Sequence, residues 1–300
     1  MSKISEEAGL VGIVTVTFNS GAVLPDFIQS LNAQDYRANR IWAIDNDSKD
    51  NSVVQLRSWG REHLQIIENR ENLGVAEANN QGIRAALDAG CEYILLLNND
   101  VIFGPTLISD LVKGLSDYAC SMTTPLIYFA DQPNRIWAAG GCFRKDYPCL
   151  NQHIGEKEID NGQYSEPKAI TYAPSCCLLI KSEVFKHIGF MDERYFVYFD
   201  DTDFMLRALR AGKITYYLPK TKLWHKVSSL TGGDESPFNQ RYMERNRAFF
   251  IKKNFSSWNF IYYTILFRLH YVVRYLKGRD TLDALLRKQR AWSEGQKMIR

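Results

Sequence analysis

Residues 10–31 read LVGIVTVTFNSGAVLPDFIQSL and combine a β-branched apolar run, a turn and apolar residues at helical spacing. The run 10–18 predicts a strand, Asn19, Ser20 and Gly21 predict a turn, and 23–31 predicts a helix. The order recurs, with strands predicted at 40–44, 64–68 and 93–97 and helices at 52–59 and 75–87. Strands that begin roughly 25 to 30 residues apart with helices between them are typical of right-handed βαβ units. We therefore expect a parallel sheet covered by helices.

The pattern changes after Asp100. A helix is predicted at 104–115, where Pro105 lies in the first turn, and a strand at 121–127. Many Gly, Pro and Asn residues at 130–174 predict loops, which we expect to contact a partner. The remaining elements predicted before position 212 are a buried strand at 176–180 and helices at 182–188 and 203–211.

Composition excludes several classes of protein. The chain has 300 residues, enough for two domains or one large one, and is 45% hydrophobic and 24% charged, unlike disordered, collagen-like or membrane-embedded chains. The six cysteines include no C-x-x-C pair, which favours reduced thiols and a cytosolic environment. Residues 1–7 lack an apolar stretch, so we expect neither a secretory signal nor a membrane anchor there.

Polar residues follow the predicted strands at one edge of the sheet. Ligands of parallel α/β sheets bind at this edge, where loops converge and helix N-termini offer free N–H groups to phosphate. Amide and carboxylate oxygens there also suit a hard divalent ion that shares a diphosphate. Ordinary turn residues are the alternative interpretation of each cluster. The clusters are Thr17-Phe18-Asn19, Asp45-Asn46-Asp47-Ser48 with Asp50, Asn72-Leu73-Gly74 and Asn98-Asn99-Asp100.

A second constellation places Asp200, Asp201 and Asp203 at the start of a helix, directly after the aromatic run 195–199. The helix dipole favours carboxylates at this position and helps to keep one ionised as a base. Arg207 lies four residues after Asp203, a spacing that predicts an ion pair. An acidic helix cap is the alternative, although an exposed cap needs no run of aromatic residues.

His225 follows an apolar run and is a candidate metal ligand, whereas a lone histidine is more often structural or on the surface. Lys226 and the glycines at 232 and 233 could instead form a loop that covers a phosphate.

Together these motifs resemble the family 2 glycosyltransferases of the GT-A fold, and the rhamnosyltransferase-like bacterial members in particular, over residues 11–253. The resemblance also rests on Asn79 and Gly82, Gly140-Gly141 and Phe190-Met191-Asp192-Glu193. It implies an α/β fold with a Rossmann-like, mostly parallel central sheet flanked by helices. The implied catalytic domain is 1–240, with a nucleotide-binding half at 10–100 and an acceptor-binding half at 101–240, followed by a helical extension at 241–300.

The resemblance also implies an activity and residue roles. An inverting enzyme would move rhamnose or a similar hexose from a dTDP- or UDP-sugar to a hydroxyl of a glycan or lipid-linked glycan, in cell-surface polysaccharide synthesis. Asp201 would be the general base, and Asp100 and His225 would bind Mn²⁺ or Mg²⁺. The implied substrate-binding residues are Thr17, Phe18, Asn19, Asp45, Asp47, Asn72, Gly74, Asn79, Asn98, Gly141, Asp200 and Arg207.

Three positions depart from the family pattern. Asn98 stands where Asp is frequent, which suggests weaker metal binding, and Asp200 stands where Glu often precedes the base. Cys176 and Cys177 replace residues that are often small, so the acceptor pocket is expected to differ.

The C-terminal extension is basic and aromatic. From Gln240 onward there are 14 basic and 4 acidic residues, a net charge of +10, whereas the residues before it include 23 basic and 30 acidic, a net charge of −7. The overall charge of +3 is therefore the sum of a basic and an acidic part. Such a segment suits the anionic inner face of a plasma membrane, where it would hold a cytoplasmic enzyme peripherally. Arg268, His270 and Arg274 interrupt its apolar run at 258–276, which predicts a surface-lying helix. A helical cap on the catalytic domain or a homodimer contact is an equal alternative. Without a reader motif, we expect no nucleic-acid partner.

Two other classes of function compete with transfer. A nucleotidyltransferase would carry a basic Gly-rich loop after the first strand, but residues 19–22 contain no Lys or Arg. A non-catalytic sugar-nucleotide-binding protein would have no need of intact base and metal positions.

Overall fold

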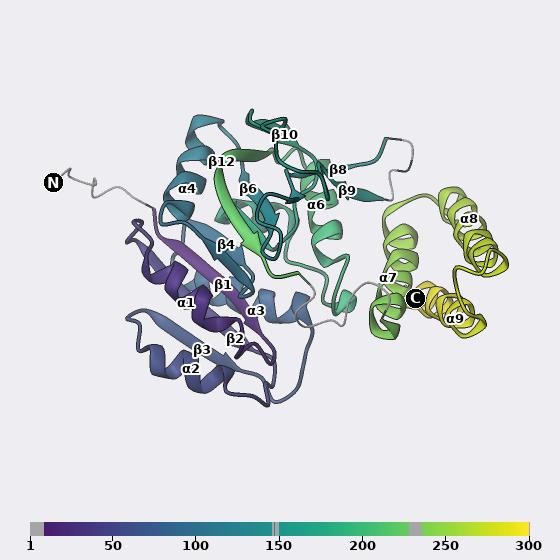
Figure 1. Ribbon diagram of the computed structural model, residues 1–300, viewed down its shortest axis with the longest axis horizontal. Helices are drawn as coiled ribbons and strands as arrows, with labels where there is room; N and C mark the ends of the chain where they lie inside the picture. Colours follow the sequence, from purple (N-terminus) through teal and green to yellow (C-terminus); the bar gives the residue numbers. More distant parts are fainter. Residues whose placement is uncertain (1–8, 146, 148–149, 228–235, 300) are drawn as a thin grey trace.

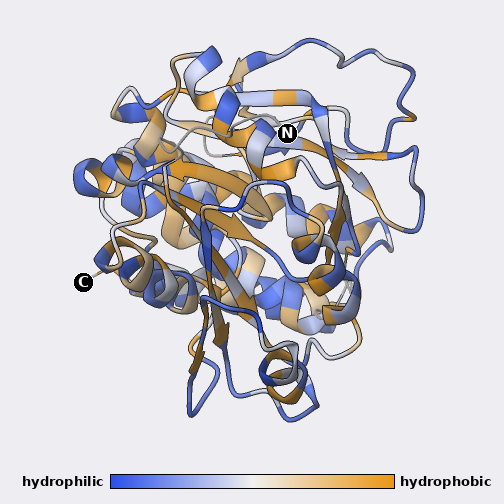
Figure 2. Cartoon of the chain, turned by 90° about the vertical axis from the view of Figure 1, so that its left-hand side faces the viewer, coloured by the Kyte–Doolittle hydropathy of each residue, from blue (hydrophilic) through white to orange (hydrophobic). Residues whose placement is uncertain are grey.

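The computed structural model describes residues 9–145, 147, 150–227 and 236–299, so the expectation for residues 1–7 lies outside the described part. A twisted central sheet carries helices on both faces (Figure 1). Apolar strands occupy the interior and polar segments surround them (Figure 2). In spatial order, the main path of the sheet is β3 (Leu64–Glu68), β2 (Asn39–Asp45), β1 (Val11–Thr17), β4 (Tyr93–Leu97), β11 (Cys177–Lys181), β6 (Met122–Phe129), β12 (Thr215–His225) and β10 (Lys168–Ile170).

The first half of the sheet is parallel. β1 pairs in parallel with both β2 and β4, and β2 pairs in parallel with β3. Alternate residues of each strand face opposite sides, so Val14 packs in one apolar cluster and Ile13 in another. The helices of this half are α1 (Leu24–Asn32), α2 (Ser52–Trp59) and α3 (Val75–Asp88). Because α3 contributes to the first cluster and α1 and α2 to the second, the sheet is covered on both faces, as predicted.

Beyond β4 the sheet is mixed, which limits the expected mostly parallel arrangement to the first half. β11 runs antiparallel to both β4 and β6, and β12 is parallel to β6. The predicted loop stretch 130–174 contains short strands that sequence periodicity did not reveal, because three residues are too few to establish a period. The elements not yet given for this half are β5 (Val101–Phe103), α4 (Leu107–Asp117), β7 (Ile136–Ala138), β8 (Gly141–Phe143), β9 (Asn151–His153), α5 (Ser182–Ile188), η1 (Glu193–Tyr195) and α6 (Asp200–Arg210).

Three helices form the C-terminal extension on one side of the molecule (Figure 1): α7 (Pro237–Asn254), α8 (Ser257–Leu276) and α9 (Leu282–Lys297). Side chains of Ser236, Ser256 and Thr281 cap their N-termini by accepting backbone N–H groups. The extension shares an apolar core with the catalytic part, because Phe249 and Trp292 cluster with Tyr195. The predicted boundary at 240/241 falls inside α7. Within the described residues, no helix is long and apolar enough to cross a membrane.

Candidate functional site

The ends of β1 and β2 bring two predicted site residues together. Parallel pairing places Thr17 opposite Asp45. The Thr17 hydroxyl donates to Asp45 Oδ1 at 2.9 Å, and the backbone N–H of Ser48 donates to Oδ2 at 2.9 Å. Both oxygens of a largely buried carboxylate are therefore oriented by the protein. Such a carboxylate can accept a further N–H from a ligand, because each oxygen has two lone pairs.

The neighbouring turns interlock at this edge. Asn19 and Asp47 have φ of 52° and 67°, the left-handed region that Asn and Asp tolerate better than most residues. The N–H of Asn19 donates to Ser48 Oγ at 2.9 Å, and Asn19 Oδ1 accepts the N–H of Lys49 at 2.8 Å. Phe18 is 38% exposed on the same rim. Asn19 is thus a turn residue by its contacts, and the aromatic face of Phe18 is open to a ligand.

Gly74 lies where the loop before α3 meets the segment before α6. Its φ is +87°, and a Cβ there would lie 2.5 Å from the carbonyl oxygen of Phe196. The next N–H, of Val75, donates to the same carbonyl at 2.5 Å, and Asn72 Oδ1 accepts the Gly74 N–H at 2.9 Å. Glycine is required here by both the backbone angle and the close approach.

A second junction lies along α3. Asn79, a predicted substrate-binding residue, is buried in this helix. Its neighbour Asn80 makes the cross-domain bonds, donating to the Met191 carbonyl at 2.9 Å and accepting the Met191 N–H at 3.0 Å. Asn79 and Asn80 have the same side chain, so the sequence could not distinguish them. The orientation of α3 about its axis decides which of the two faces Met191.

The Asn98-Asn99-Asp100 motif divides into three environments. Asn98 is exposed at the end of β4, whereas Asn99 is buried and donates to the carbonyl of Val16 at 2.5 Å. Asp100 Oδ1 lies 3.2 Å from Nε2 of His225. Antiparallel pairing of β5 with β12 brings these two residues together from positions 125 residues apart, since His225 lies opposite Val101.

The Asp100 and His225 pair fits a divalent cation as two adjacent ligands. Neighbouring ligands of an octahedral ion with bonds of about 2.1 Å are about 3.0 Å apart, close to the observed separation. In the described part of the chain, no group of three or more His, Cys, Asp or Glu residues could hold a metal. Two protein ligands suffice where phosphate and water complete the shell, as is usual for Mg²⁺ at nucleotide sites.

Asp200 and Asp201 differ in environment although they are adjacent. Asp201 is partly exposed, and its Oδ2 accepts the hydroxyl of Tyr172 at 2.9 Å. Asp200 is buried, and burial together with the Asp201 charge raises the pKa of Asp200 to about 7. Burial and Asp201 also raise the pKa of Tyr172 well above its usual value, so Tyr172 stays a proton donor in this hydrogen bond. Of the two carboxylates, Asp201 is therefore the one that is partly exposed and bonded to Tyr172.

An aromatic wall that the sequence did not reveal connects Asp201 to the Asp100 and His225 pair. His153 stacks on Tyr172 with ring centroids 5.9 Å apart, and Trp137 packs edge-on against both His153 at 4.4 Å and His225 at 4.7 Å. Burial lowers the pKa of His153, against the opposing Asp201 charge, which favours the neutral ring. Contacts thus run without a break from Asp201 to His225. The wall comes from the loop-rich stretch, where residue spacing offered no signal.

Gly141 supports this wall from behind. A Cβ on Gly141 would lie 2.5 Å from the ring of Tyr172, and the Gly141 carbonyl accepts the Tyr172 N–H at 3.2 Å. Its position supports placement of Tyr172, the partner of Asp201.

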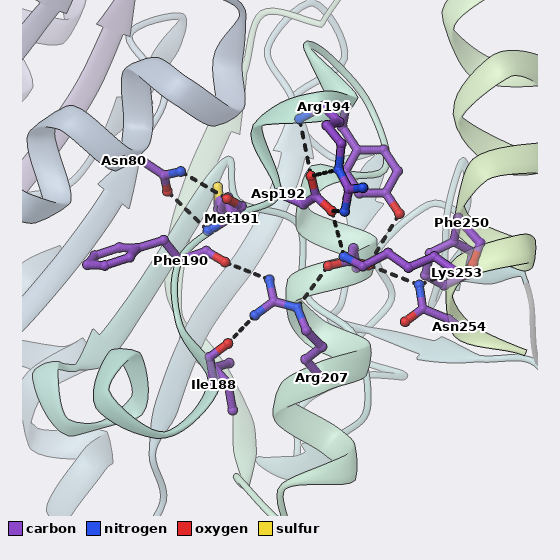
Figure 3. A network of polar contacts seen from close by, with 12 residues as sticks. Asn80, Ile188, Phe190, Met191, Asp192, Arg194, Arg207, Phe250, Lys253 and Asn254 are labelled. Atoms are coloured by element: carbon purple, nitrogen blue, oxygen red, sulfur yellow. Dashed lines mark hydrogen bonds and ion pairs between the residues drawn. The ribbon is translucent and has the colours of Figure 1, made fainter. Parts of the chain in front are cut away.

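Arg207 forms the predicted ion pair with Asp203. It donates to Asp203 Oδ2 at 2.8 Å, and its other nitrogens donate to the carbonyls of Ile188 and Phe190 (Figure 3). All three nitrogens of Arg207 therefore have partners within the protein.

Lys253 of α7 completes the network around Asp203. Its Nζ lies 2.8 Å from Asp203 Oδ1 and 2.7 Å from Asp192 Oδ2, and Arg194 also binds Asp192 (Figure 3). Burial alone would raise the pKa of Asp192, but hydrogen bonds from Arg194 and Lys253 hold it well below its usual range. The network joins the extension to the acid-rich start of α6.

The basic residues of α7 each have a partner within the chain. Each binds an acidic side chain or a backbone carbonyl of another segment or its own helix. They are Arg241 with Glu294, Arg245 with the carbonyls of Arg194 and Tyr195, Arg247 with Glu244, Lys252 with the carbonyl of Gln296, and Lys253 as above.

Lys226 pairs with Asp26 of α1 at 2.5 Å. The glycines at 232 and 233, expected in a loop that covers phosphate, lie outside the described residues.

Comparison with known proteins agrees with this geometry. Residues 12–189 match the model of the family described as glycosyl transferase family 2. The chain is 25% identical over 256 residues to a dTDP-rhamnosyl transferase, RfbF, of Shigella flexneri, covering 80% of this chain and 79% of that protein. It is 26% identical over 270 residues to an N-acetylglucosaminyl-diphospho-decaprenol L-rhamnosyltransferase of Mycobacterium tuberculosis, covering 82% and 85%.

Solved structures show the same fold. A mannosyltransferase of Pyrobaculum calidifontis in complex with GDP-Man and Mn²⁺ matches with a TM-score of 0.57 and 15% identity, over 82% of this chain and 64% of that one. GalNAc-T7 with UDP, GalNAc and Mn²⁺ matches with a TM-score of 0.59 and 16% identity, over 82% of this chain and 50% of that one. The polar strand ends, the family match over more than half of the chain and the shared architecture lead to one conclusion: the chain belongs to glycosyl transferase family 2 and is a glycosyltransferase of the GT-A fold.

Proposed function

We propose that the enzyme inverts the anomeric centre while it transfers rhamnose or a similar hexose from a dTDP- or UDP-sugar to a hydroxyl of a glycan or lipid-linked glycan. The observation that carries this proposal is the unbroken line of contacts from Asp201 through Tyr172, His153 and Trp137 to His225. It supports a single site with a carboxylate at one end and a cation pair at the other. The names of the two rhamnosyltransferase relatives support the donor and acceptor classes.

The donor base would lie at the ends of β1 and β2. A pyrimidine imide has one N–H, and the Asp45 carboxylate, oriented by Thr17 and Ser48, is an acceptor for it. Phe18 offers a ring for stacking on the base. The remaining residues proposed to surround the donor or acceptor are Asn19, Asp47, Asn72, Gly74, Asn79, Asn98 and Asp200.

The chemistry is one displacement. The acceptor oxygen bonds to the anomeric carbon, the bond from that carbon to the diphosphate oxygen breaks, and the diphosphate leaves with the electron pair. Asp201 takes the hydroxyl proton, and the Tyr172 hydroxyl orients its carboxylate. Burial and the Asp201 charge raise the pKa of Asp200 to about 7, so a proton on Asp200 is favoured below neutrality and reduces the second charge beside the base. Asp100 and His225 would hold Mn²⁺ or Mg²⁺, which when bound supplies positive charge to the leaving diphosphate.

The donor assignment predicts which nucleotides stabilise the protein. At a hundredfold excess over Kd, a ligand adds about 2.7 kcal/mol, which raises Tm by about 5 °C for a domain of this size. We expect this shift with UDP- or dTDP-sugars and Mn²⁺, and much less with GDP-mannose, in a thermal-shift screen. Asp45→Ala is the matched variant and should remove the preference. Equal Tm shifts with GDP-mannose and UDP-glucose in wild type would contradict the pyrimidine pocket. Release of free sugar and nucleoside diphosphate from the donor would establish turnover.

The extension is proposed to bind an anionic membrane through one face of α8. Its exposed apolar side chains follow helical spacing and form a continuous stripe, with Trp258 81% exposed. α8 has no acidic residue, and Arg268 lies next to Leu269 of the stripe, which favours anionic lipid over a second copy of the same face. The stripe is Trp258, Ile261, Ile265, Leu269, Val272 and Leu276.

A hollow lined by Arg268 of α8 and by residues of α9 adds to this argument. Its volume is about 510 Å³, and Arg268, Arg290 and Lys297 line it together with Glu294. Three cations around one hollow suit the phosphate of a lipid headgroup. The proposal places the enzyme peripherally at the inner face of the plasma membrane, near a lipid-linked acceptor.

Two substitutions in the stripe test the membrane proposal. Ile265→Ser with Leu269→Ser should lower binding to phosphatidylglycerol-containing vesicles at least about tenfold, because each buried apolar side chain contributes about 2 kcal/mol. Turnover of a soluble acceptor should not change. The control, Val54→Ser with Ile214→Ser, alters exposed apolar residues outside the extension. If the wild-type protein does not bind vesicles but sediments as a dimer, and the stripe variant sediments as a monomer, the face is a subunit contact and the membrane proposal is wrong.

A further inference from the structure

The backbone just before Asp200 is strained. Phe196 has φ of 65° and ψ of −60°, and the N–H of Val197 donates to the Tyr195 carbonyl at 2.7 Å, which together make a γ-turn of the rare form. Tyr198 and Phe199 follow with φ of 62° and 67°. Left-handed backbone at a non-glycine residue costs about 1–3 kcal/mol and persists only where surrounding structure holds it. The strained turn, residues 195–199, therefore needs external support.

Asn246 of α7 supplies much of that support. Its side chain is 0% exposed, and Nδ2 donates to the carbonyls of Tyr195 at 2.8 Å, Val197 at 2.7 Å and Tyr198 at 2.9 Å. Arg245 Nε donates to Asn246 Oδ1 at 2.8 Å, which sets the orientation of the amide. A single amide thus binds three of the five carbonyls in the strained turn.

The turn is held from two other directions. Arg245 donates through one nitrogen to the carbonyls of Arg194 at 3.0 Å and Tyr195 at 2.8 Å. On the opposite side, the carbonyl of Phe196 accepts the N–H of Val75 beside Gly74. Helix α9 backs α7 at the same level, since a Cβ on Gly295 would lie 1.9 Å from the Arg245 carbonyl.

We propose that Asn246 is a positioning residue for catalysis: it holds the strained turn in the conformation that delivers Asp201 to Tyr172. The inference rests on the proposed role of Asp201 as the base. It makes the C-terminal extension part of the active site, whatever surface α8 contacts. Loss of the amide leaves the turn free to relax, and a misplacement of about 1 Å at a reacting group can cost about a hundredfold in rate.

The test is Asn246→Ala. We expect kcat to fall about a hundredfold with the KM for donor changed less than about threefold, because the donor base binds on β1 and β2. Hydrogen exchange of the amides at 195–203 should accelerate relative to wild type. Adding Asn246→Ala to Asp201→Asn should cause little further loss, since both changes disable the same group.

Tyr271→Phe is the control for stability alone. Tyr271 of α8 is buried, and its hydroxyl binds Glu244 of α7 rather than a carbonyl of the strained turn. It should lower Tm but leave kcat and exchange at 195–203 as in wild type. Should Asn246→Ala not fold, Arg245→Met removes the bonds to Arg194 and Tyr195 and should cost about tenfold in kcat, corresponding to about 1.4 kcal/mol.

Wild-type kcat in Asn246→Ala, or an equal loss of kcat in Tyr271→Phe, would overturn the inference, as would unchanged exchange at 195–203. Failure of the proposed function has a different signature. If Asp201→Asn remains active while Asn246→Ala accelerates exchange, Asp201 is not the base and the support of the turn by Asn246 stands.

Discussion

Asp201→Asn lowers the rate of sugar transfer about a thousandfold and leaves nucleotide binding within about twofold of wild type, because a positioned general base contributes about 10²–10⁴. The asparagine oxygen can still accept the Tyr172 hydroxyl, so the local geometry survives. It cannot take a proton from the acceptor. Steady-state kinetics with donor and acceptor, together with a Kd for the nucleoside diphosphate, measure the two effects separately.

Two variants make the Asp201 experiment specific. Asp88→Asn alters an exposed carboxylate at the end of α3 and should leave both rate and binding unchanged. Asp203→Asn alters a buried carboxylate of the same helix turn and should lower Tm, since it weakens ion pairs with Arg207 and Lys253. Turnover at the wild-type rate in Asp201→Asn would remove Asp201 from the mechanism.

Asp100→Ala is expected to have the second large effect. It removes one of the two side chains proposed to hold the cation, and the charge that a metal gives to a leaving diphosphate is worth several kcal/mol. We expect transfer to fall at least about a hundredfold, and chelation of wild type with EDTA to do the same. A direct binding measurement should show that Mn²⁺ tightens UDP or dTDP binding to wild type about tenfold and has no effect on the variant.

The binding measurement distinguishes a loss of the cation site from a loss of activity through misfolding. Asp110→Asn, a partly exposed carboxylate position on α4, serves as the control and should retain the dependence on Mn²⁺. Full transfer by Asp100→Ala in the presence of EDTA would show that neither Asp100 nor a cation takes part.

Local periodicity was sufficient for most of the fold. The predicted bounds of α2, β3, β4 and α5 coincide with those observed. The three-residue strands β5, β7, β8, β9 and β10 were missed, since three residues carry too little pattern, and the longer strand β12 was not predicted either. Trp137, His153 and Tyr172 lie in or beside those strands, so the wall of the site was missed with them.

Chain order and spacing were enough to determine the βαβ half and the meeting of Thr17 with Asp45, since parallel strands joined by right-handed crossovers bring their carboxyl ends to one edge. They could not distinguish the three acids at the start of α6, which have the same chemistry in sequence. Tertiary contacts distinguish them: Asp200 is buried, Asp201 accepts a hydrogen bond from a tyrosine, and Asp203 forms ion pairs with two basic side chains. The same holds for Asn246 and Lys253 of α7, whose partners lie about fifty residues away. The role of such a side chain depends on which backbone group or charge from a distant segment packs against it, and the local sequence pattern does not determine that partner.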